Sequence, residues 1–479
     1  MKNVSIARVT VVLSVFLLSG HAAFGEPTPS PASSATDETN SLPLEVSKKI
    51  DEAATKMLSE SGVPSASIAV VKEGKQAYTK AYGLADIASH RPATTSMIYS
   101  VGSISKQFTA ASMLLLAEQG KLSLDDPVGR WLPELERTDK VTIRQVLSMT
   151  SGYQDYWPQD YVMPSMMKPA LPEEILKGWS QKPLDFEPGT KWQYSNTNYV
   201  AAGVIVERLT GMSVVDFLRR RVFDRLGMKS VFDCDSSALP SEAPTRYHRY
   251  GLGPARPAPK EGKGWLFAAG ELAMTASDLA KWDISMIDRA ILKPESHREM
   301  ETAELLKNGA STQYGLGVGV SLVNGRRVLA HGGEVSGFTA QNAIYPDDRA
   351  AVIVLTNMDA NRAAVNLANK IGEIIFAPTG NRDSLAKAKA ILVDLQKGKI
   401  DRSLFTENAN AYFVKQCLHD LASSLASLGA PTDFELVSEG LRGGMTAHRY
   451  RAKFQKKTLE VSTYAMPDGK LEQYIVSPE

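Results

Sequence analysis

Hydrophobic positions recur at helical spacing in a stretch around which the rest of the sequence is organised. Across 107–119, apolar residues stand three and four positions apart, and Gly120 follows them. This spacing places the apolar side chains on one face, and glycine is typical of a helix end. The pattern predicts a buried helix that carries the segment 103–106 at its head.

Alternating apolar and polar residues predict strands on both sides of this helix. We expect strands at 66–72, 76–82, 337–345 and 352–356, with turns at 73–75 and 346–348, and helices at 44–61 and 363–376. The chain from 125 to about 285 has mostly helical and loop patterns. Two strands, a long helical insertion and further strands predict an α+β fold: an antiparallel sheet flanked by helices, with an all-helical lobe.

The pattern changes character after about residue 381. Helices are expected at 385–395 and 408–428, and strands at 434–437, 449–454, 458–464 and 471–476, with Asp468-Gly469 as a hairpin turn. The sequence therefore predicts a small α+β accessory domain at 379–479 after a larger domain at 43–378. No motif in the small domain carries chemistry, so its expected role is to pack on or gate a cleft, with a separate ligand site as the alternative.

The first residues have the features of a secretory signal. Lys2 and Arg8 flank the start of an apolar run at 9–18, and the small residues that follow end in Ala23-Phe24-Gly25. This pattern predicts a signal peptide at 1–25, and the Pro-, Ser- and Thr-rich stretch 26–42 predicts a flexible tether. We expect a periplasmic or extracellular protein without a stable membrane span after cleavage; an uncleaved anchor is the alternative.

Composition narrows the partners. The 479-residue chain has a net charge of +1 and no basic run, which argues against nucleic acid. Cys234 and Cys417 stand far apart, so two buried free thiols are expected, although a disulfide is possible in an oxidising compartment. Neither a Cys-x-x-Cys nor a His-Glu-x-x-His pattern occurs, so we expect neither a metal nor a cofactor. The pattern leaves the oligomeric state open.

Ser103 and Lys106 stand three positions apart, which places them on one face of a helix, one turn from each other. An amine in apolar surroundings loses proton affinity and can then accept the hydroxyl proton of a serine. The helix N-terminus would stabilise a developing oxyanion. The spacing alone is weak evidence, because it recurs at 165–168 and 384–387.

Two further motifs follow in the chain. Tyr194 and Asn196 lie between a Pro-Gly turn and an apolar helical run, so we expect them on a loop, where a phenol can transfer protons and a carboxamide can bind a substrate amide. The alternative is a buried tyrosine beside a helix-capping asparagine. His331-Gly332-Gly333 follows the strand-like 327–330, and its glycines would let a substrate backbone approach.

With these motifs in this order, the sequence resembles the serine β-lactamase-related family, which includes class C β-lactamases, DD-peptidases, D-aminopeptidases and esterases of the β-lactamase fold. The resemblance covers about 44–378. It is carried by the three motifs and by the segments 99–109, 120–127, 151–153, 211–213, 226–228 and 315–317. It implies a catalytic cleft between the sheet and the helical lobe, where the motifs meet.

The resemblance implies a mechanism and a site. Ser103 would form an acyl-enzyme with a small-molecule or peptide substrate, and Lys106 and Tyr194 would share the general acid and base work. Asn196, His331, Gly332 and Gly333 would bind the substrate. The backbone N–H groups of Ser103 and Glu334 would hold the oxyanion.

This sequence departs from the family's β-lactamases at the third motif. His331 stands where lysine is usual, and with a pKa near 6.5 it is charged only in acid. The carboxylate of Glu334 would repel an anionic substrate, although a solvated loop position is the alternative. Met149 replaces a histidine of many relatives, and we expect little effect on the chemistry. These departures favour a peptidase or esterase; the alternatives are a penicillin-binding receptor that acylates without turnover, and an interaction protein with an idle cleft.

Overall fold

The structure is a computed structural model, and it describes residues 39–159, 161–323, 325–376 and 382–479. We call 39–376 the large body and 382–479 the C-terminal body, and each is described by itself. The predicted signal peptide and most of the predicted tether lie outside the described residues. The predicted domain boundary at 378/379 also falls outside them.

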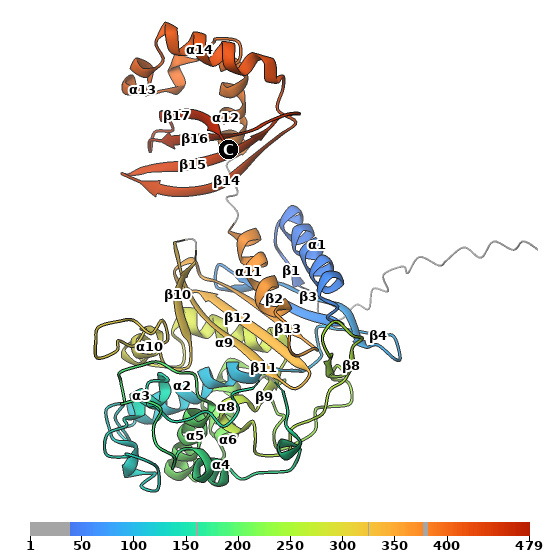
Figure 1. Cartoon of the computed structure of the whole chain (residues 1–479), viewed down its shortest axis with the longest axis vertical. Helices are drawn as coiled ribbons and strands as arrows, with labels where there is room; N and C mark the ends of the chain where they lie inside the picture. Colours follow the sequence, from blue (N-terminus) through green and yellow to red (C-terminus); the bar gives the residue numbers. More distant parts are fainter. Residues whose placement is uncertain (1–38, 160, 324, 377–381) are drawn as a thin grey trace, which may run out of the picture. The chain divides into compact units, whose positions relative to one another are not determined.

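The large body is built on one antiparallel sheet (Figure 1). Its strands run in the order β1-β3-β2-β13-β12-β11-β10, and β4 pairs with β3. The strands are β1 (Thr39–Asn40), β2 (Ser65–Lys72), β3 (Lys75–Asp86), β4 (Arg91–Pro92), β10 (Gly319–Val323), β11 (Arg326–Val335), β12 (Phe338–Tyr345) and β13 (Ala350–Thr356). The four strands predicted here are confirmed, and β3 continues four residues beyond its predicted end.

Both faces of this sheet are buried, and β13 shows how one run of apolar residues serves two cores. Ala351, Ile353 and Leu355 belong to the large core beneath the helical lobe. Val352 and Val354 alternate with them and pack in a second core. Because side chains alternate across a strand, a continuous apolar run is expected for a strand that is covered on both faces.

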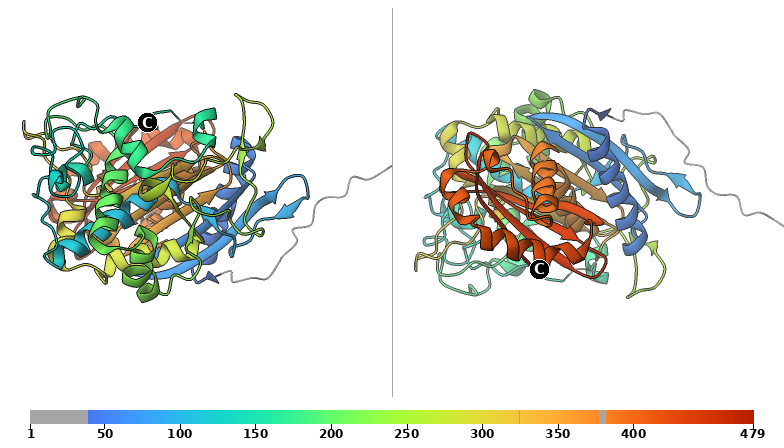
Figure 2. Two further views of the ribbon diagram at one scale, coloured as in Figure 1. Left: turned by 90° about the horizontal axis from the view of Figure 1, so that it is seen from below. Right: turned by 90° about the horizontal axis from the view of Figure 1, so that it is seen from above.

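Helices cover each face (Figure 2). The outer face packs on α1 (Leu44–Ser61) and α11 (Ala363–Ile375), which contribute Ile50 and Leu367 to the second core. The inner face packs on α2 (Ser105–Glu118) and α9 (Ala276–Asp288), which contribute Phe108 and Trp282 to the large core. The predicted fold class, an antiparallel sheet with flanking helices, is confirmed.

The helical lobe lies between β4 and β10 in the chain. Its remaining helices are α3 (Ile143–Leu147), α4 (Pro172–Trp179), α5 (Asn196–Thr210), α6 (Val214–Leu218), α7 (Asp224–Leu226), α8 (Phe267–Gly270) and α10 (Pro294–Glu301). Short strands lie among them: β5 (Tyr99–Ser100), β6 (Phe232–Asp233) and β9 (Leu272–Met274) form one sheet, and β7 (Tyr247–His248) and β8 (Arg256–Pro257) another.

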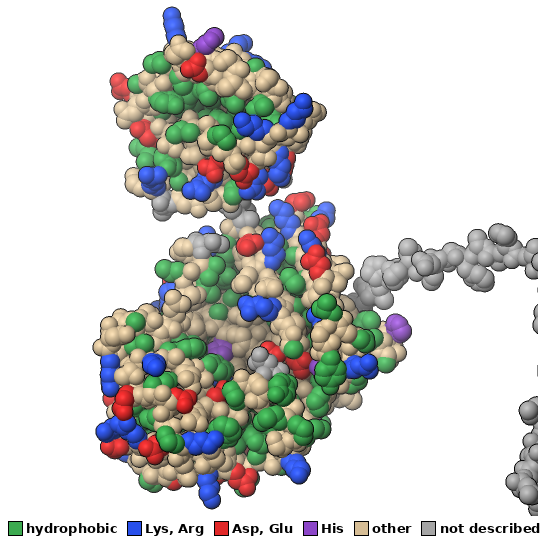
Figure 3. Space-filling view, in the orientation of Figure 1, with side chains coloured by type: hydrophobic (Ala, Val, Ile, Leu, Met, Phe, Trp, Pro, Cys, Tyr) green, Lys and Arg blue, Asp and Glu red, His purple; other side chains and the backbone are tan. Residues whose placement is uncertain are grey.

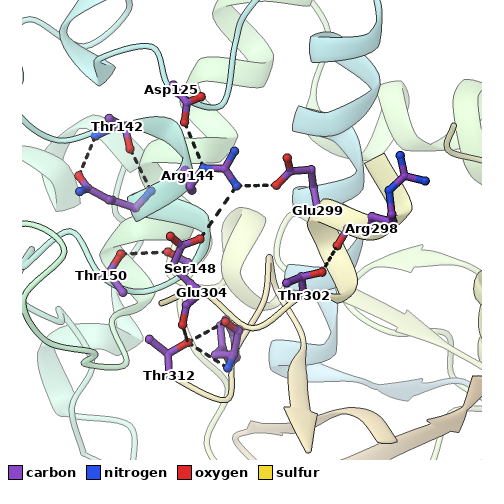
Figure 4. Close-up of polar contacts among 12 residues, drawn as sticks. Asp125, Thr142, Arg144, Ser148, Thr150, Arg298, Glu299, Thr302, Glu304 and Thr312 are labelled. Atoms are coloured by element: carbon purple, nitrogen blue, oxygen red, sulfur yellow. Dashed lines mark hydrogen bonds and ion pairs between the residues drawn. The ribbon is translucent and has the colours of Figure 1, made fainter. Parts of the chain in front are cut away.

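A charged cluster fixes α3 within this lobe (Figure 4). Arg144 of α3 lies 3.1 Å from Asp125 and 2.5 Å from Glu299 of α10, and its guanidinium also approaches Glu304 at 4.0 Å. At the start of α3, Thr142 accepts a hydrogen bond from the backbone N–H of Gln145 in a capping box, which satisfies a free donor of the first turn. The loop after α3 leads to the cleft, so this cluster anchors one wall of it.

The C-terminal body has its own antiparallel sheet and its own hydrophobic core. The strands β14 (Asp433–Arg442), β15 (Met445–Lys453), β16 (Thr458–Ala465) and β17 (Leu471–Pro478) lie in chain order, and the helices are α12 (Arg382–Leu395), α13 (Glu407–Tyr412) and α14 (Lys415–Leu425). The prediction of a single helix at 408–428 is wrong, because this stretch contains the two helices α13 and α14. The helix is interrupted at Phe413, whose side chain is buried in the core. A short 3-10 turn at 426–428 follows α14.

Two remaining predictions concern the cysteines and the membrane. Both Cys234 and Cys417 are free; Cys234 is buried, whereas Cys417 is half-buried. Within the described ranges, no helix is both long enough and apolar enough to cross a membrane.

Candidate functional site

Ser103 lies in a 3-10 turn (Gly102–Ile104) directly before α2, two residues before Ser105, the first α-helical position. Gly102 has a positive φ of 52°, and a Cβ there would lie 2.8 Å from the backbone nitrogen of Glu334. Only glycine therefore lets the nucleophile turn pack this tightly against β11. The sequence places Ser103 at the helix head, as expected, but within a tighter turn.

Lys106 is completely buried, and its amine lies among three oxygens. Its Nζ is 2.9 Å from Ser103 Oγ, 2.8 Å from Asn196 Oδ1 and 2.8 Å from the carbonyl oxygen of Ala269. Burial lowers the pKa of Lys106 to about 7, and the nearby charge of Asp155 opposes this shift. At neutral pH a large fraction of the amine is therefore uncharged.

The three neighbours of this amine are not equivalent. The carboxamide oxygen of Asn196 and the carbonyl of Ala269 can only accept hydrogen bonds, so they occupy two N–H groups of Lys106. In the neutral amine the third direction holds the lone pair, and Ser103 Oγ lies there. The arrangement can therefore take the proton of the Ser103 hydroxyl.

Tyr194 closes the other side of the serine. It shares a hydrogen bond with Ser103, and Lys106 Nζ lies 5.0 Å from the centre of its ring. Burial raises the pKa of Tyr194 well above its usual value, and the hydrogen bond with Ser103 opposes this only in part. The phenol therefore keeps its proton at neutral pH and can donate it.

Asn196 does not lie on the predicted loop, because it is the first residue of α5. Its carboxamide nitrogen lies 3.2 and 3.3 Å from the two carboxylate oxygens of Asp155, while its oxygen faces Lys106. The carboxamide of Asn196 therefore links Asp155 to Lys106, and its predicted role in substrate binding stays a prediction. Tyr194 remains just ahead of the helix.

His331, Gly332 and Gly333 lie within β11 and not after its end, which corrects the predicted strand end at residue 330. Pairing with β12, in the register His331 to Asn342, carries the strand through both glycines despite their weak strand preference. Burial, together with the charge of Lys106, lowers the pKa of His331 to about 4. The ring is therefore neutral at physiological pH, and its Nε2 lies 3.0 Å from the hydroxyl of Tyr314.

The strand and the nucleophile turn are in direct contact. A Cβ on Gly333 would lie 1.9 Å from the carbonyl oxygen of Val101 and 3.3 Å from the backbone nitrogen of Ser103. In the described sheet, β10 pairs with β11 only as far as Ala330, so the edge at 331–335 has no further strand partner. Backbone groups of this edge thus line the space in front of Ser103.

Glu334 follows the two glycines inside the strand, so it is not a loop residue. One of its carboxylate oxygens lies 2.7 Å from the backbone nitrogen of Ala360 and accepts its hydrogen bond. The side chain is largely exposed and lines the cleft. The side chain of Met149 is buried, and its sulfur accepts a hydrogen bond from the backbone N–H of Ser195 at 3.4 Å. Met149 thus supports the loop that holds Tyr194.

These groups surround a cavity of about 740 Å³. Figure 3 shows the hollow on one face of the large body, with acidic side chains at its rim. The charged or titratable residues that line it are Asp155, Tyr156, Tyr161, Tyr194, His331, Glu334, Asp359 and Arg362, and Ser103 lies among them. Sequence reasoning missed Asp155 and Asp359. Asp155 follows the segment 151–153 by two positions, and its proximity to that segment was the available signal.

A serine hydroxyl, a buried amine, a phenol and an open strand edge come together in this cleft, within a fold of the β-lactamase type. The family model described as Beta-lactamase matches residues 50–373. The chain belongs to this family of serine hydrolases.

The relatives agree with this assignment. The chain is similar to penicillin-binding protein 4* of Bacillus subtilis (strain 168), with 28% identity over 364 residues, 71% of this chain and 77% of that protein. It is also similar to a D-aminopeptidase of Brucella anthropi, with 29% identity over 308 residues, 63% of this chain. The match covers only 58% of that D-aminopeptidase.

A solved structure shows the same fold. The octameric penicillin-binding protein homologue from Pyrococcus abyssi has a TM-score of 0.61 and 20% identity, and the match covers 90% of this chain and 99% of that one. A match over 90% of this chain includes more residues than lie before the end of the large body at 376, so the likeness in fold includes part of the C-terminal body.

Proposed function

We propose that this chain hydrolyses an amide or ester through an acyl-enzyme on Ser103. The observation that carries the proposal is the environment of Lys106: a buried amine with two fixed acceptors, a pKa of about 7 and Ser103 Oγ at 2.9 Å. An uncharged amine in this position is a general base matched to neutral pH.

Acylation follows from this geometry. Ser103 Oγ bonds to the substrate carbonyl carbon while its proton passes to Lys106, and the backbone N–H groups of Ser103 and Glu334 hold the oxyanion. The protonated phenol of Tyr194 then donates its proton to the leaving nitrogen or oxygen as the bond to the carbon breaks. The proton on Lys106 then passes to the phenolate of Tyr194, which returns the amine and the phenol to their starting protonation states. Loss of one oxyanion donor typically costs about 10²- to 10³-fold in rate.

Deacylation uses the same groups in reverse. A water takes the place of the leaving group, loses its proton to the Tyr194 and Lys106 pair, and attacks the acyl carbon. Ser103 recovers its proton when the Oγ–carbon bond breaks. Asn196, His331, Gly332 and Gly333 form the walls against which the acyl group rests.

The charges in the cleft support a substrate without an essential carboxylate. His331 is neutral above a pH of about 4. The carboxylates of Glu334 and Asp359 line the same cavity as Arg362, which is the one Lys or Arg among the described residues that line it. An acidic lining attracts an ammonium group and repels a carboxylate. We therefore propose amides or esters that carry a free amino group, a class consistent with the names of the D-aminopeptidase relatives.

Intact mass over time tests the acyl-enzyme. The protein is mixed separately with a penicillin, a p-nitrophenyl ester and a D-alanine p-nitroanilide, with Ser103→Ala as the control. We expect a transient adduct with released product for the ester and the anilide, and none in the control. A stable penicillin adduct without product from any compound would instead support the receptor alternative. The same adduct in Ser103→Ala would contradict the proposal.

Substrate charge is tested with matched anilides. D-Alanine p-nitroanilide carries an ammonium, its N-acetyl derivative is neutral and its N-succinyl derivative is anionic. We expect kcat/KM to fall in that order, by about tenfold or more between the first and the last. Glu334→Gln removes one carboxylate but leaves the backbone. It should therefore reduce the ratio of kcat/KM between the ammonium and the anionic substrate several-fold. An unchanged ratio would contradict a role for this charge.

We also propose export, with cleavage after Gly25, supported by the basic start, the apolar run 9–18 and the small residues before Glu26. The N-terminal peptide of the mature protein, read by mass spectrometry from fractionated cells, tests this directly. We further propose 43–378 as the catalytic domain and 379–479 as an accessory domain. The separate core of the C-terminal body supports that division.

A further inference from the structure

Asp155 is a carboxylate at the cleft wall that none of the sequence motifs includes. It lies in the loop after α3 and lines the cavity beside Ser103 and Asn196. Its Oδ1 accepts hydrogen bonds from the backbone N–H of Asn196 at 2.9 Å and from that of Trp157 at 3.2 Å. Its two oxygens also lie 3.2 and 3.3 Å from the carboxamide nitrogen of Asn196.

These contacts determine which way the carboxamide of Asn196 points. The NH₂ group faces a carboxylate, which can only accept, so the oxygen is directed to Lys106 Nζ at 2.8 Å. The reverse orientation would place an oxygen against the carboxylate of Asp155 and an NH₂ against the N–H groups of Lys106. Both contacts would be repulsive. Asp155 therefore selects the orientation that keeps an acceptor on the amine.

Asp155 also sets the charge near the amine. The other titratable groups around Lys106 are the phenols of Tyr194, Tyr199 and Tyr314, whose pKa values burial raises, and the ring of His331, which is neutral at physiological pH. Asp155 provides the negative charge that keeps the pKa of Lys106 from falling further. Burial raises the pKa of Asp155 itself, and the bonds from Trp157 and Asn196 oppose that shift.

We propose that Asp155 is a positioning residue for the general base: it fixes the carboxamide of Asn196 so that its oxygen orients Lys106 toward Ser103, and its charge tunes the amine. The proposal rests on the proposed function, because it assigns a role to Asp155 only if Lys106 activates Ser103. It differs from a purely structural role, in which Asp155 would only hold the start of α5.

The test is the pH profile of Ser103 acylation by a p-nitrophenyl ester in Asp155→Asn. The substitution keeps the size of the side chain and removes the charge. We expect the rate on the alkaline plateau to fall by about 10²-fold, the cost typical of a misplaced catalytic group. We also expect the acid limb to move to lower pH by about one unit, because loss of an opposite charge lowers the pKa of Lys106. If Asp155→Asn is slower but its rate falls at the same acidic pH as in the wild type, the charge of Asp155 does not affect the protonation of Lys106, and that part of the proposal is overturned.

A double-mutant cycle separates positioning from folding. If Asp155 acts through the carboxamide, Asp155→Asn should cost less than about threefold on the plateau in an Asn196→Ala background, whereas the shift of the acid limb should persist. Equal costs in both backgrounds would overturn the positioning role. Circular dichroism melting of each variant identifies those that fail to fold, and only folded variants enter the cycle.

Asp347→Asn is the matched control. Asp347 lies in the turn after β12, is 69% exposed and does not line the cleft, so both the plateau and the acid limb should stay unchanged. The two proposals fail differently. Absence of any Ser103 adduct in the wild type would overturn the proposed function, whereas a normal wild-type adduct with an unaltered Asp155→Asn profile would overturn this inference alone.

Discussion

The chain contains the same serine and lysine pattern in two helical settings, and the surroundings of the two lysine amines differ. In the large body, Lys106 is completely buried and its amine lies 2.9 Å from Ser103 Oγ. In α12 of the C-terminal body, Lys387 donates instead to the carbonyl oxygen of Gly469 at 2.7 Å, near the surface. Ser384 there is hydrogen-bonded to Tyr450. The spacing is identical, but each side chain of the second pair has a separate structural partner.

The difference shows that a spacing of three positions lets a lysine amine reach a serine hydroxyl, whereas burial lowers the proton affinity of that amine. Lys106 loses part of its proton affinity because water is excluded from it, and Asn196 and Ala269 fix its direction. In the third copy of the pattern, at 165–168, both Ser165 and Lys168 are exposed, so this lysine is not buried as Lys106 is.

The largest expected effect comes from removing each serine in turn. Ser103→Ala should lower ester hydrolysis by about 10⁶-fold, the scale typical of a lost nucleophile that acts with its base. Ser384→Ala should leave the rate within twofold. Steady-state hydrolysis of a p-nitrophenyl ester measures both, and a comparable loss in the two variants would contradict the distinction.

Removing each amine should have a smaller effect. Lys106→Met keeps most of the buried stem and removes the base, so acylation should slow by about 10³- to 10⁴-fold. Lys387→Met should not change it. Stopped-flow release of p-nitrophenol in a single turnover measures the acylation step. A Lys106→Met enzyme at nearly wild-type rate would show that Tyr194 acts as the base without the lysine.

The two glycines of the third motif allow a finer comparison. A Cβ on Gly333 would lie 1.9 Å from the carbonyl oxygen of Val101. One on Gly332 would lie 3.3 Å from the flexible end of Gln341 and 3.9 Å from the carbonyl oxygen of Ala340, which is ordinary contact. Gly333→Ala should therefore push β11 from the nucleophile turn and lower kcat by about 10²- to 10³-fold through the oxyanion donors. Gly332→Ala should lower it less than tenfold. Equal effects would show that the strand edge does not hold the oxyanion.

Much of this architecture could be predicted from local patterns. The period of the apolar residues identified α2, and the continuous run 350–356 belongs to a strand buried on both faces. The site could be predicted where a motif is short in sequence, as for Ser103 and Lys106. The rest depends on contacts between distant segments.

Three examples show why. Asp155 meets Asn196 across 41 positions, so no local pattern connects them. Strand β11 continues through Gly332 and Gly333 because pairing with β12 outweighs the weak strand preference of glycine. Helices α13 and α14 separate where Phe413 enters the core, although the apolar period runs through the break. In each case tertiary packing overrode the local signal.

The central claim is that Lys106 activates Ser103 as an uncharged amine, and the pH dependence of Ser103 acylation tests it most directly. Because a lysine must lose its proton to act as a base, the single-turnover rate should rise tenfold per pH unit below a pH of about 7 and level off above it. His331 should not contribute to this limb, because its pKa lies near 4. A rate that stays constant down to pH 5, or that levels off only near the pKa of an ordinary lysine at about 10.4, would contradict the account.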